Sequence, residues 1–137
     1  MDFAVAAEVA FDYLADPRNR PEWQSSLRRV ELVDEDVRVG QRWIDVTVPG
    51  IRPQMETRVL ERPLAWSETG RWRGVEARLT LSFEPAAQGC RVLAQVRVRG
   101  RGLWRPLGPL ATVAAAVAVP GDLRRAARIL SARSAEH

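Results

Sequence analysis

The sequence predicts a single α+β domain in which a curved antiparallel sheet wraps around a long C-terminal helix. Helical segments follow the first few residues, a period of two runs over residues 27–100, and a long helical segment covers residues 104–133. Consecutive strands joined by short turns form an antiparallel meander, whose apolar side must be covered. Only the C-terminal segment is long enough to cover it.

The N-terminal region predicts a short strand followed by two short helices. The strand candidate lies within the first five residues. Apolar side chains then recur at i, i+3, i+4 and i+7, on one face of a helix: Ala7, Ala10, Phe11 and Leu14. Asp16 and Pro17 end this helix, and Pro21 begins a second, very short one that contains Trp23.

The middle of the chain predicts about six further strands, which makes six to seven in total. They are expected at residues 27–33, 41–48, 55–61, 64–73, 75–84 and 90–100. Residues 75–84 alternate most clearly, with Leu79, Leu81 and Phe83 on the apolar side, and Val96 lies on the apolar side of the last strand. Such alternation is typical of an antiparallel sheet with one covered face.

The C-terminal helix carries an apolar stretch and a break signal. Leu110 to Val119 is apolar on all sides, so we expect this stretch to be buried. Pro120 and Gly121 are expected to interrupt or kink the helix. Asp122 is then expected to cap its second half.

Length and composition bound the function. The 137 residues suit one domain, and their 46% apolar and 28% charged content is ordinary for a globular protein. The net charge is +4, and every Lys or Arg residue counted in it is Arg. The arginines are spread along the chain and mixed with acidic residues, so we expect no nucleic-acid partner. One cysteine excludes an internal disulfide, and the N-terminus lacks a signal-peptide pattern, so we expect a cytoplasmic protein.

The sequence lacks the residues that a structural zinc site, an activated nucleophile or a phosphate-binding loop needs. The one histidine, His137, is the last residue, and one His with one Cys cannot form a structural zinc site. A Ser–His or Cys–His pair cannot form in the body of the fold. The glycines are scattered as in turns, with no phosphate-binding motif. We therefore expect no metal and no cofactor.

The chain resembles the START-like superfamily, also called SRPBCC, in its polyketide-cyclase/dehydrase branch. The resemblance rests on Phe11–Trp23 (FDYLADPRNRPEW), Val37–Trp43 (VRVGQRW), the hairpin of Arg78–Val92 and the C-terminal helix, and it covers nearly the whole chain. It implies a helix-grip fold with a cavity between sheet and helix, which holds lipids, sterols, polyketides or other apolar molecules. Some members catalyse aromatisation, cyclisation or dehydration. The chain departs from the pattern in its short first strand and at Pro120-Gly121.

Candidate ligand contacts are apolar residues on the predicted inner surfaces. They are Trp23, Trp66, Trp72, Leu79, Leu81, Phe83, Val96, Leu110, Val113 and Val117. Trp66 and Trp72 are six residues apart on one strand, so they share a face unless Gly70 introduces a bulge. Ordinary core packing is the alternative for each of these residues.

Candidate catalytic residues are Tyr13, Arg42 and Ser67. An inward Tyr can donate a proton, and an inward Arg can polarise a carbonyl group. The strand faces are ambiguous for six polar residues, and an outward, solvated position is the alternative for each: Arg42, Asp45, Glu56, Ser67, Glu68 and Arg71.

Three functions are left open by the sequence. The first is binding of a hydrophobic small molecule, lipid-like or polyketide-like, between sheet and helix. The second is a cofactor-free polyketide aromatase/cyclase or dehydratase that uses the same cavity. The third is a module that grips a protein partner. No integral membrane segment is expected, and the short first strand leaves a sheet edge through which a homodimer could form.

Overall fold

Seven strands form one antiparallel sheet with the order β1-β7-β6-β5-β4-β3-β2 in the computed structural model, which describes residues 1–48 and 50–136. The strands are β1 (Asp2–Phe3), β2 (Leu27–Leu32), β3 (Arg42–Thr47), β4 (Gln54–Glu61), β5 (Ala65–Trp72), β6 (Val75–Ala86) and β7 (Gly89–Gly100). Consecutive strands from β2 to β7 are neighbours, and β1 pairs with β7 at the opposite edge. The predicted meander and its short first strand are confirmed.

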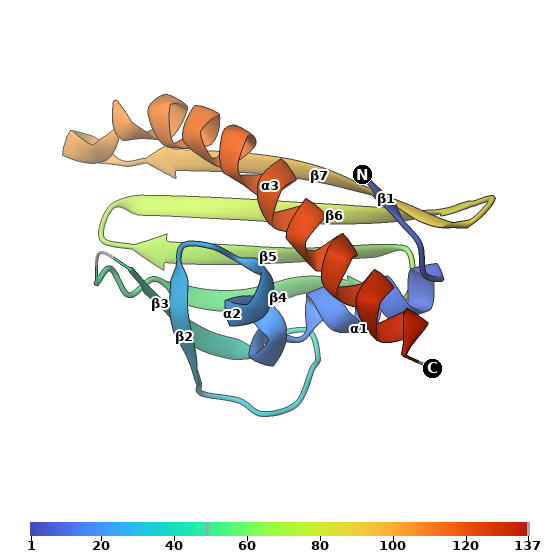
Figure 1. The fold of residues 1–137 in the computed structure, drawn as a ribbon. Helices are drawn as coiled ribbons and strands as arrows, with labels where there is room; N and C mark the ends of the chain where they lie inside the picture. Colours follow the sequence, from blue (N-terminus) through green and yellow to red (C-terminus); the bar gives the residue numbers. More distant parts are fainter. Residues whose placement is uncertain (49, 137) are drawn as a thin grey trace.

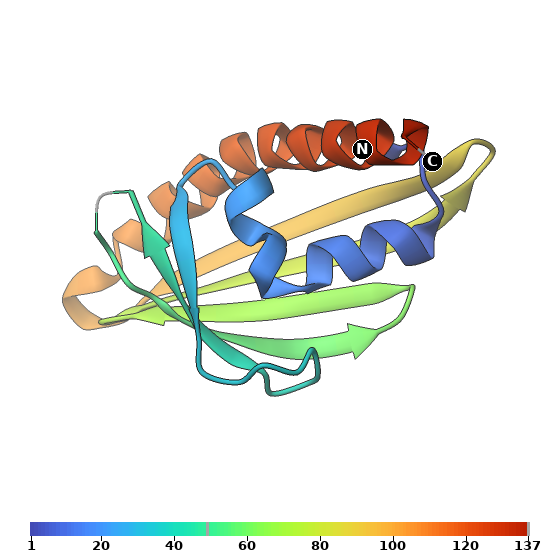
Figure 2. The same cartoon turned by 60° about the horizontal axis from the view of Figure 1, so that its bottom comes forward.

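The helical elements are α1 (Ala7–Ala15), the 3₁₀ turn η1 (Pro17–Asn19), α2 (Arg20–Trp23), the 3₁₀ turn η2 (Gly102–Trp104) and α3 (Leu107–Ala135). α1, α2 and the second half of α3 lie on the concave side of this curved sheet (Figures 1 and 2). The end of α3 lies beside α1, and its beginning runs along β7 (Figure 1). This is the predicted helix-grip arrangement.

The strand register keeps apolar side chains on the concave side. β6 and β7 pair without a shift over their whole length, from Val75 opposite Gly100 to Ala86 opposite Gly89. β5 and β6 also pair without a shift, so Trp66 and Trp72 share a face. β4 has an irregularity between Thr57 and Val59, which places Thr57 opposite Glu68.

The hydrophobic core fills one end of this concave side. The predicted apolar face of α1 is buried there, with the Phe11 and Phe83 ring centroids 5.2 Å apart. The second half of α3 adds Leu123, Ala126 and Leu130. A helix and a helix end therefore cover the end of the sheet nearest the β6–β7 turn.

The prediction that Leu110–Val119 is buried is wrong. Leu110, Val113 and Val117 are 68%, 65% and 76% exposed. This half of α3 covers the unpaired edge of β7 instead of the face of the sheet, because β1 pairs only with Cys90 and Arg91. A helix on an edge buries only one side.

Thr112 makes this edge contact. Its hydroxyl accepts from the backbone N–H of Val98 at 3.0 Å and donates to the carbonyl oxygen of Gly108 at 2.8 Å. A Cβ on Gly108 would lie 3.0 Å from the carbonyl oxygen of Val98, so glycine allows the close approach. The hydroxyl satisfies a strand N–H that a sheet edge leaves open.

The predicted interruption at Pro120-Gly121 is also wrong. α3 continues from Leu107 to Ala135 with Pro120 inside it. Asp122 caps no helix; its carboxylate accepts from the backbone N–H of Ser25 at 3.3 Å and from the hydroxyl of Ser25 at 3.0 Å. Asp122 thus ties α3 to the segment that follows α2. No helix among the described residues is long and apolar enough to cross a membrane.

Candidate functional site

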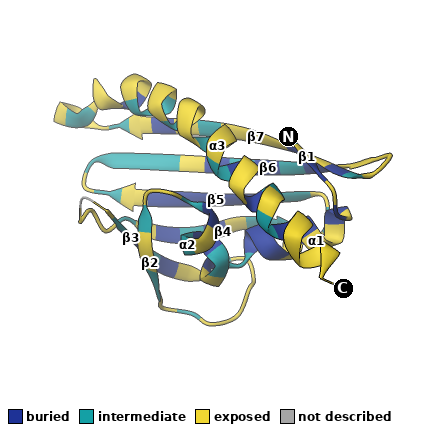
Figure 3. Ribbon diagram, in the orientation of Figure 1, coloured by how far each residue is buried: buried dark blue, intermediate teal, exposed yellow. Residues whose placement is uncertain are grey.

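The concave side of β5–β7 is covered at one end and partly open at the other. Ala94, on the inward side of β7, is exposed although Val92 on the same side is buried. Further along, Val98 is buried, and the other inward residues are half-buried: Trp72, Val75, Ala77 and Val96. Figure 3 shows this half-buried part of β6 in teal. Apolar surface therefore lies between the sheet and the first half of α3 without a full cover.

The predicted ligand contacts fall into three groups. The first is buried in the core, against α1 or under α2: Trp23, Trp66, Leu79, Leu81 and Phe83. Trp72 and Val96 lie on the half-buried part of the concave side. Leu110, Val113 and Val117 point to solvent on the side of α3 that faces away from β7. The structure does not bring these three groups together.

A buried ionic cluster lies beside the core, under α2. Arg20, from α2, is 2% exposed and donates from Nη1 and Nη2 to the two carboxylate oxygens of Glu68 on β5, at 2.7 and 3.0 Å. Its Nη2 also donates to Oδ2 of Asp45 on β3, at 3.1 Å. Arg20, Asp45 and Glu68, here called the Arg20 cluster, join α2 to two strands.

Local sequence explains how Arg20 reaches this position. The carboxylate of Asp16 accepts from the backbone N–H of Arg18, so the chain turns through η1 directly into α2. Arg20 and Trp23 are three residues apart on one side of α2. The guanidinium carbon of Arg20 lies 5.9 Å from the ring centroid of Trp23 and 5.5 Å from that of Trp43. The two rings shield the charge from water.

The electrostatics of the Arg20 cluster favour a bound proton. The pKa of Glu68 is raised to about 7: burial raises it most, the Arg20 guanidinium lowers it, and the nearby Asp45 carboxylate raises it. Burial lowers the pKa of Arg20, but the two carboxylates outweigh burial and raise it above its usual value. One guanidinium faces two carboxyl groups, so Glu68 holds a proton more readily than an exposed Glu.

Several buried polar atoms near this cluster have no hydrogen-bond partner within the described residues. They are Arg20 Nε, Trp23 Nε1, Trp66 Nε1, Thr57 Oγ1 and Gln41 Oε1. Thr57 lies opposite Glu68, and Trp66 precedes Glu68 by two residues on the same face of β5. Unpaired buried donors are costly and call for water or another oxygen. This region can therefore hold a polar group.

The apolar surface and the Arg20 cluster share one side of β5. Every second residue of β5 faces inward, and these residues include Glu68, Gly70 and Trp72. A Cβ on Gly70 would lie 2.7 Å from the sulfur of Met55, so the Met55 side chain fills the space between the two regions. Methionine is flexible and repacks easily. Met55 is therefore an adaptable side chain at the boundary between the two regions.

The structure does not bring the three candidate catalytic residues together. The Tyr13 hydroxyl donates to Oε1 of Glu22 at 2.8 Å, and Arg133 binds the same carboxylate at 3.0 Å, so Tyr13 ties α1 to α2 and α3. Burial, together with the bond to Glu22, raises the pKa of Tyr13 well above its usual range. Ser67 is buried on the other side of β5, where its hydroxyl accepts from Nε of Arg78 at 3.3 Å.

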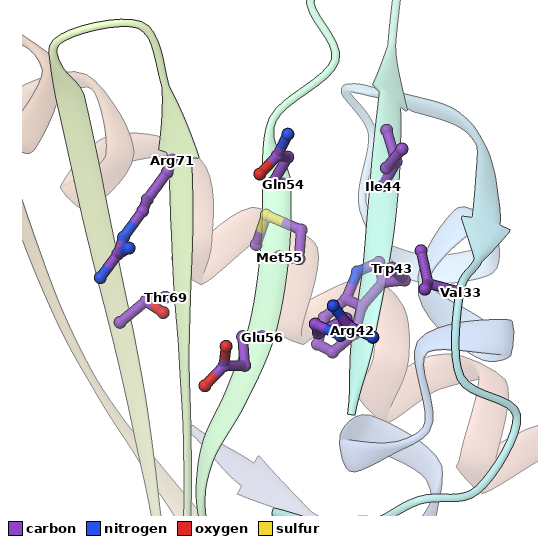
Figure 4. A pocket seen from close by; sticks show the side chains of 9 residues that line it. All are labelled: Val33, Arg42, Trp43, Ile44, Gln54, Met55, Glu56, Thr69 and Arg71. Carbon is purple, nitrogen blue, oxygen red and sulfur yellow. The ribbon is translucent and has the colours of Figure 1, made fainter. Parts of the chain in front are cut away.

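Arg42 lies on the convex side of the sheet, away from the Arg20 cluster. Its Nε donates to Asp34 at 3.2 Å. It lines a hollow of about 270 Å³ over β3, β4 and β5, together with residues that include Glu56, Thr69 and Arg71 (Figure 4). Of the six polar residues with ambiguous faces, only Asp45 and Glu68 belong to the Arg20 cluster.

Sequence reasoning missed Arg20, the residue that organises the cluster. The signal was present in the spacing of Arg20 and Trp23, which puts both on one side of a short helix. Arg is seldom buried, so composition alone points to solvent. Within the described residues, no group of three or more His, Cys, Asp or Glu side chains is arranged to hold a metal.

Comparison with known proteins gives one family and several solved structures. A family model described as polyketide cyclase / dehydrase and lipid transport matches residues 1–135. A protein of Mesorhizobium loti has a TM-score of 0.75 at 18% identity, covering 96% of this chain and 93% of its own. The structure of Ara h 8.0201 has a TM-score of 0.75 at 13% identity, covering 95% of this chain and 93% of its own.

A third solved structure is the di-domain ARO/CYC protein StfQ from the steffimycin biosynthetic pathway. It has a TM-score of 0.75 at 17% identity, covering 98% of this chain and 50% of its own. At such identities the likeness to all three structures is one of fold. None of the curated proteins compared with this chain matches it.

Proposed function

The chain belongs to the polyketide cyclase / dehydrase and lipid transport family of START-like proteins, and we propose that it binds an apolar small molecule with an oxygen function between the sheet and α3. The apolar part lies on the half-buried side chains Trp72, Val75, Ala77 and Val96. The oxygen function lies toward the Arg20 cluster.

The observation that carries this proposal is that an apolar surface and a group of buried polar atoms lie on the same side of the sheet, and that each could be completed by a ligand. Within the part of the chain that the structure describes, the apolar surface lacks a full cover, and the buried N–H groups of Arg20 Nε, Trp23 and Trp66 lack acceptors. Ligand pockets are mostly apolar with a few polar groups that fix orientation. A carbonyl or phenolic oxygen supplies the acceptor that these donors lack.

A second candidate is a cofactor-free aromatase/cyclase or dehydratase that uses the same surface. Glu68 favours it, because a carboxyl group with a pKa of about 7 can give or take a proton at neutral pH. Arg20, held against Glu68, would stabilise an enolate oxygen. In that case Glu68→Gln keeps ligand binding and loses turnover; a simple carrier has no turnover to lose.

Three finer expectations stay predictions for this family member. They are the absence of a nucleic-acid partner, homodimerisation through a sheet edge, and a cytoplasmic location. The sheet edge near β1 is short, since β1 pairs with only two residues of β7.

Filling the concave surface tests the proposed site. Ala77→Trp places an indole on the half-buried inward side of β6, and Thr80→Trp, on the outward side, is the matched control. We expect Ala77→Trp to weaken binding of palmitate and of 1-anilinonaphthalene-8-sulfonate by about tenfold or more, while the control binds as the parent does. Fluorescence titration measures both affinities, and equal affinity in all three proteins contradicts the proposal.

A further inference from the structure

The first half of α3 has an apolar side that no part of the described chain covers. We call it the outward side, made of Leu107, Leu110, Val113 and Val117, which are all exposed. Their spacing of three and four residues places them on one stripe of the helix. Gly108 and Thr112, which contact β7, lie on the opposite side. Exposed apolar patches of this kind mark interaction surfaces.

A fixed apolar tip precedes this stripe. Leu103, in η2, is 97% exposed, and Gly102 before it has a φ of 57°, which favours glycine. Trp104 beside it packs against Trp72 with ring centroids 5.5 Å apart. The base of the tip is therefore held by the sheet while Leu103 points away from it.

Arginine flanks the outward side at both ends. Arg101 and Arg105 precede it, and Arg124, Arg125 and Arg128 follow it, all exposed. These five make no ion pair within residues 1–48 and 50–136, whereas most arginines before residue 63 do. They are free to bind an external anion.

Charge is strongly divided along the chain. Residues 85–137 carry nine Arg and two acidic residues, and residues 1–84 carry twelve Arg and fifteen acidic residues. No acidic residue lies between Glu84 and Asp122, and Asp122 is bonded to Ser25. Residues 85–137, which include β7 and α3, therefore carry a net positive charge, and residues 1–84 carry a net negative one.

We propose that the outward side of α3, with the Leu103 tip, docks on the surface of an anionic lipid bilayer. The apolar side chains enter the boundary between headgroups and acyl chains, and the flanking arginines bind lipid phosphates. A second copy fits this surface less well, because two such faces would bring ten arginines together without a carboxylate. The proposal stands independently of the ligand, since it uses the other side of α3.

Vesicle flotation tests the docking surface. We expect the protein to bind vesicles of phosphatidylcholine with about one quarter phosphatidylglycerol, to bind pure phosphatidylcholine far less, and to be released by about 0.5 M NaCl. Leu110→Ser/Val117→Ser and Arg101→Gln/Arg105→Gln each weaken binding by about tenfold or more. Control variants Leu64→Ser and Arg18→Gln, exposed elsewhere, bind as the parent does.

One further variant separates the possible failures. Ala77→Trp, which fills the ligand surface, is expected to keep full vesicle binding, so loss of ligand and loss of membrane binding are distinguishable. Absence of binding to the anionic vesicles, or equal binding by all variants, overturns the proposal. A dimer in sedimentation equilibrium that Leu110→Ser/Val117→Ser dissociates also overturns it, and assigns the surface to a second copy.

Discussion

Arg20 and Glu68 lie in environments that are unusual for their residue types, because both charged side chains are buried. Arg20 is a buried charge that bonds two carboxylates, and Glu68 is a carboxyl group whose pKa burial raises to about 7. A buried charge pair contributes little net stability but is costly to break. Under the proposed function, Arg20 would donate to a ligand oxygen and Glu68 would give or take a proton.

Glu68 makes stability depend on pH. Its pKa is about 7 in the folded chain against an ordinary value of 4.5, so the folded state holds a proton that the unfolded state has released. The contribution of this group to the free energy of unfolding therefore falls as the pH rises from 4.5 to about 7.

Glu68→Gln removes this titration, and we expect a flatter pH profile for the variant. Urea unfolding at several pH values measures the slope. Glu84→Gln, exposed on β6, is the control and keeps the parent slope. A Glu68→Gln profile parallel to that of the parent contradicts the assigned proton.

Residue-level prediction succeeded where alternation was unbroken. Leu79, Leu81 and Phe83 are buried as β6 predicts, because the register of β6 with both neighbours has no shift. Asp45 and Glu68 stayed ambiguous because the sequence does not reveal the irregularity in β4 or the guanidinium that pairs with them. Tertiary charge pairing overrides the general preference of Arg for solvent.

At the scale of elements, α3 has two halves with different partners. The second half packs Leu123, Ala126 and Leu130 into the core, and the first half lies on the edge of β7 through Thr112. The sequence predicts the length of α3 but not this division. An apolar stretch is typical of burial, and the edge of β7, which needs its own cover, is not visible in the pattern.

The start of α3 depends on close backbone packing at Gly100. A Cβ there would lie 1.8 Å from the carbonyl oxygen of Trp104, so Gly100→Ala must displace η2. We expect a loss of about 1–3 kcal/mol in the free energy of unfolding. Gly121→Ala, in the middle of α3 with open space around it, should instead add about 0.5–1 kcal/mol. Chemical denaturation measures both, and equal effects contradict this packing.

At the scale of the whole molecule, the curved sheet has a closed end and a partly open end. α1, α2 and the second half of α3 close the first around the core, and the first half of α3 borders the second (Figure 2). The sequence and its resemblance predict this overall architecture. The open end of the sheet is set by the point at which α3 passes from the edge of β7 to the concave face of the sheet. The packing of the whole fold fixes this point, and the sequence pattern does not reveal it.

Native mass spectrometry of protein purified from its own source tests the central claim most directly, followed by denaturing extraction of what it carries. The account predicts one apolar molecule per chain, with a carbonyl or hydroxyl group, that Ala77→Trp fails to carry and Thr80→Trp retains. A clean apo mass that no fatty acid, sterol or aromatic polyketide shifts would contradict the account.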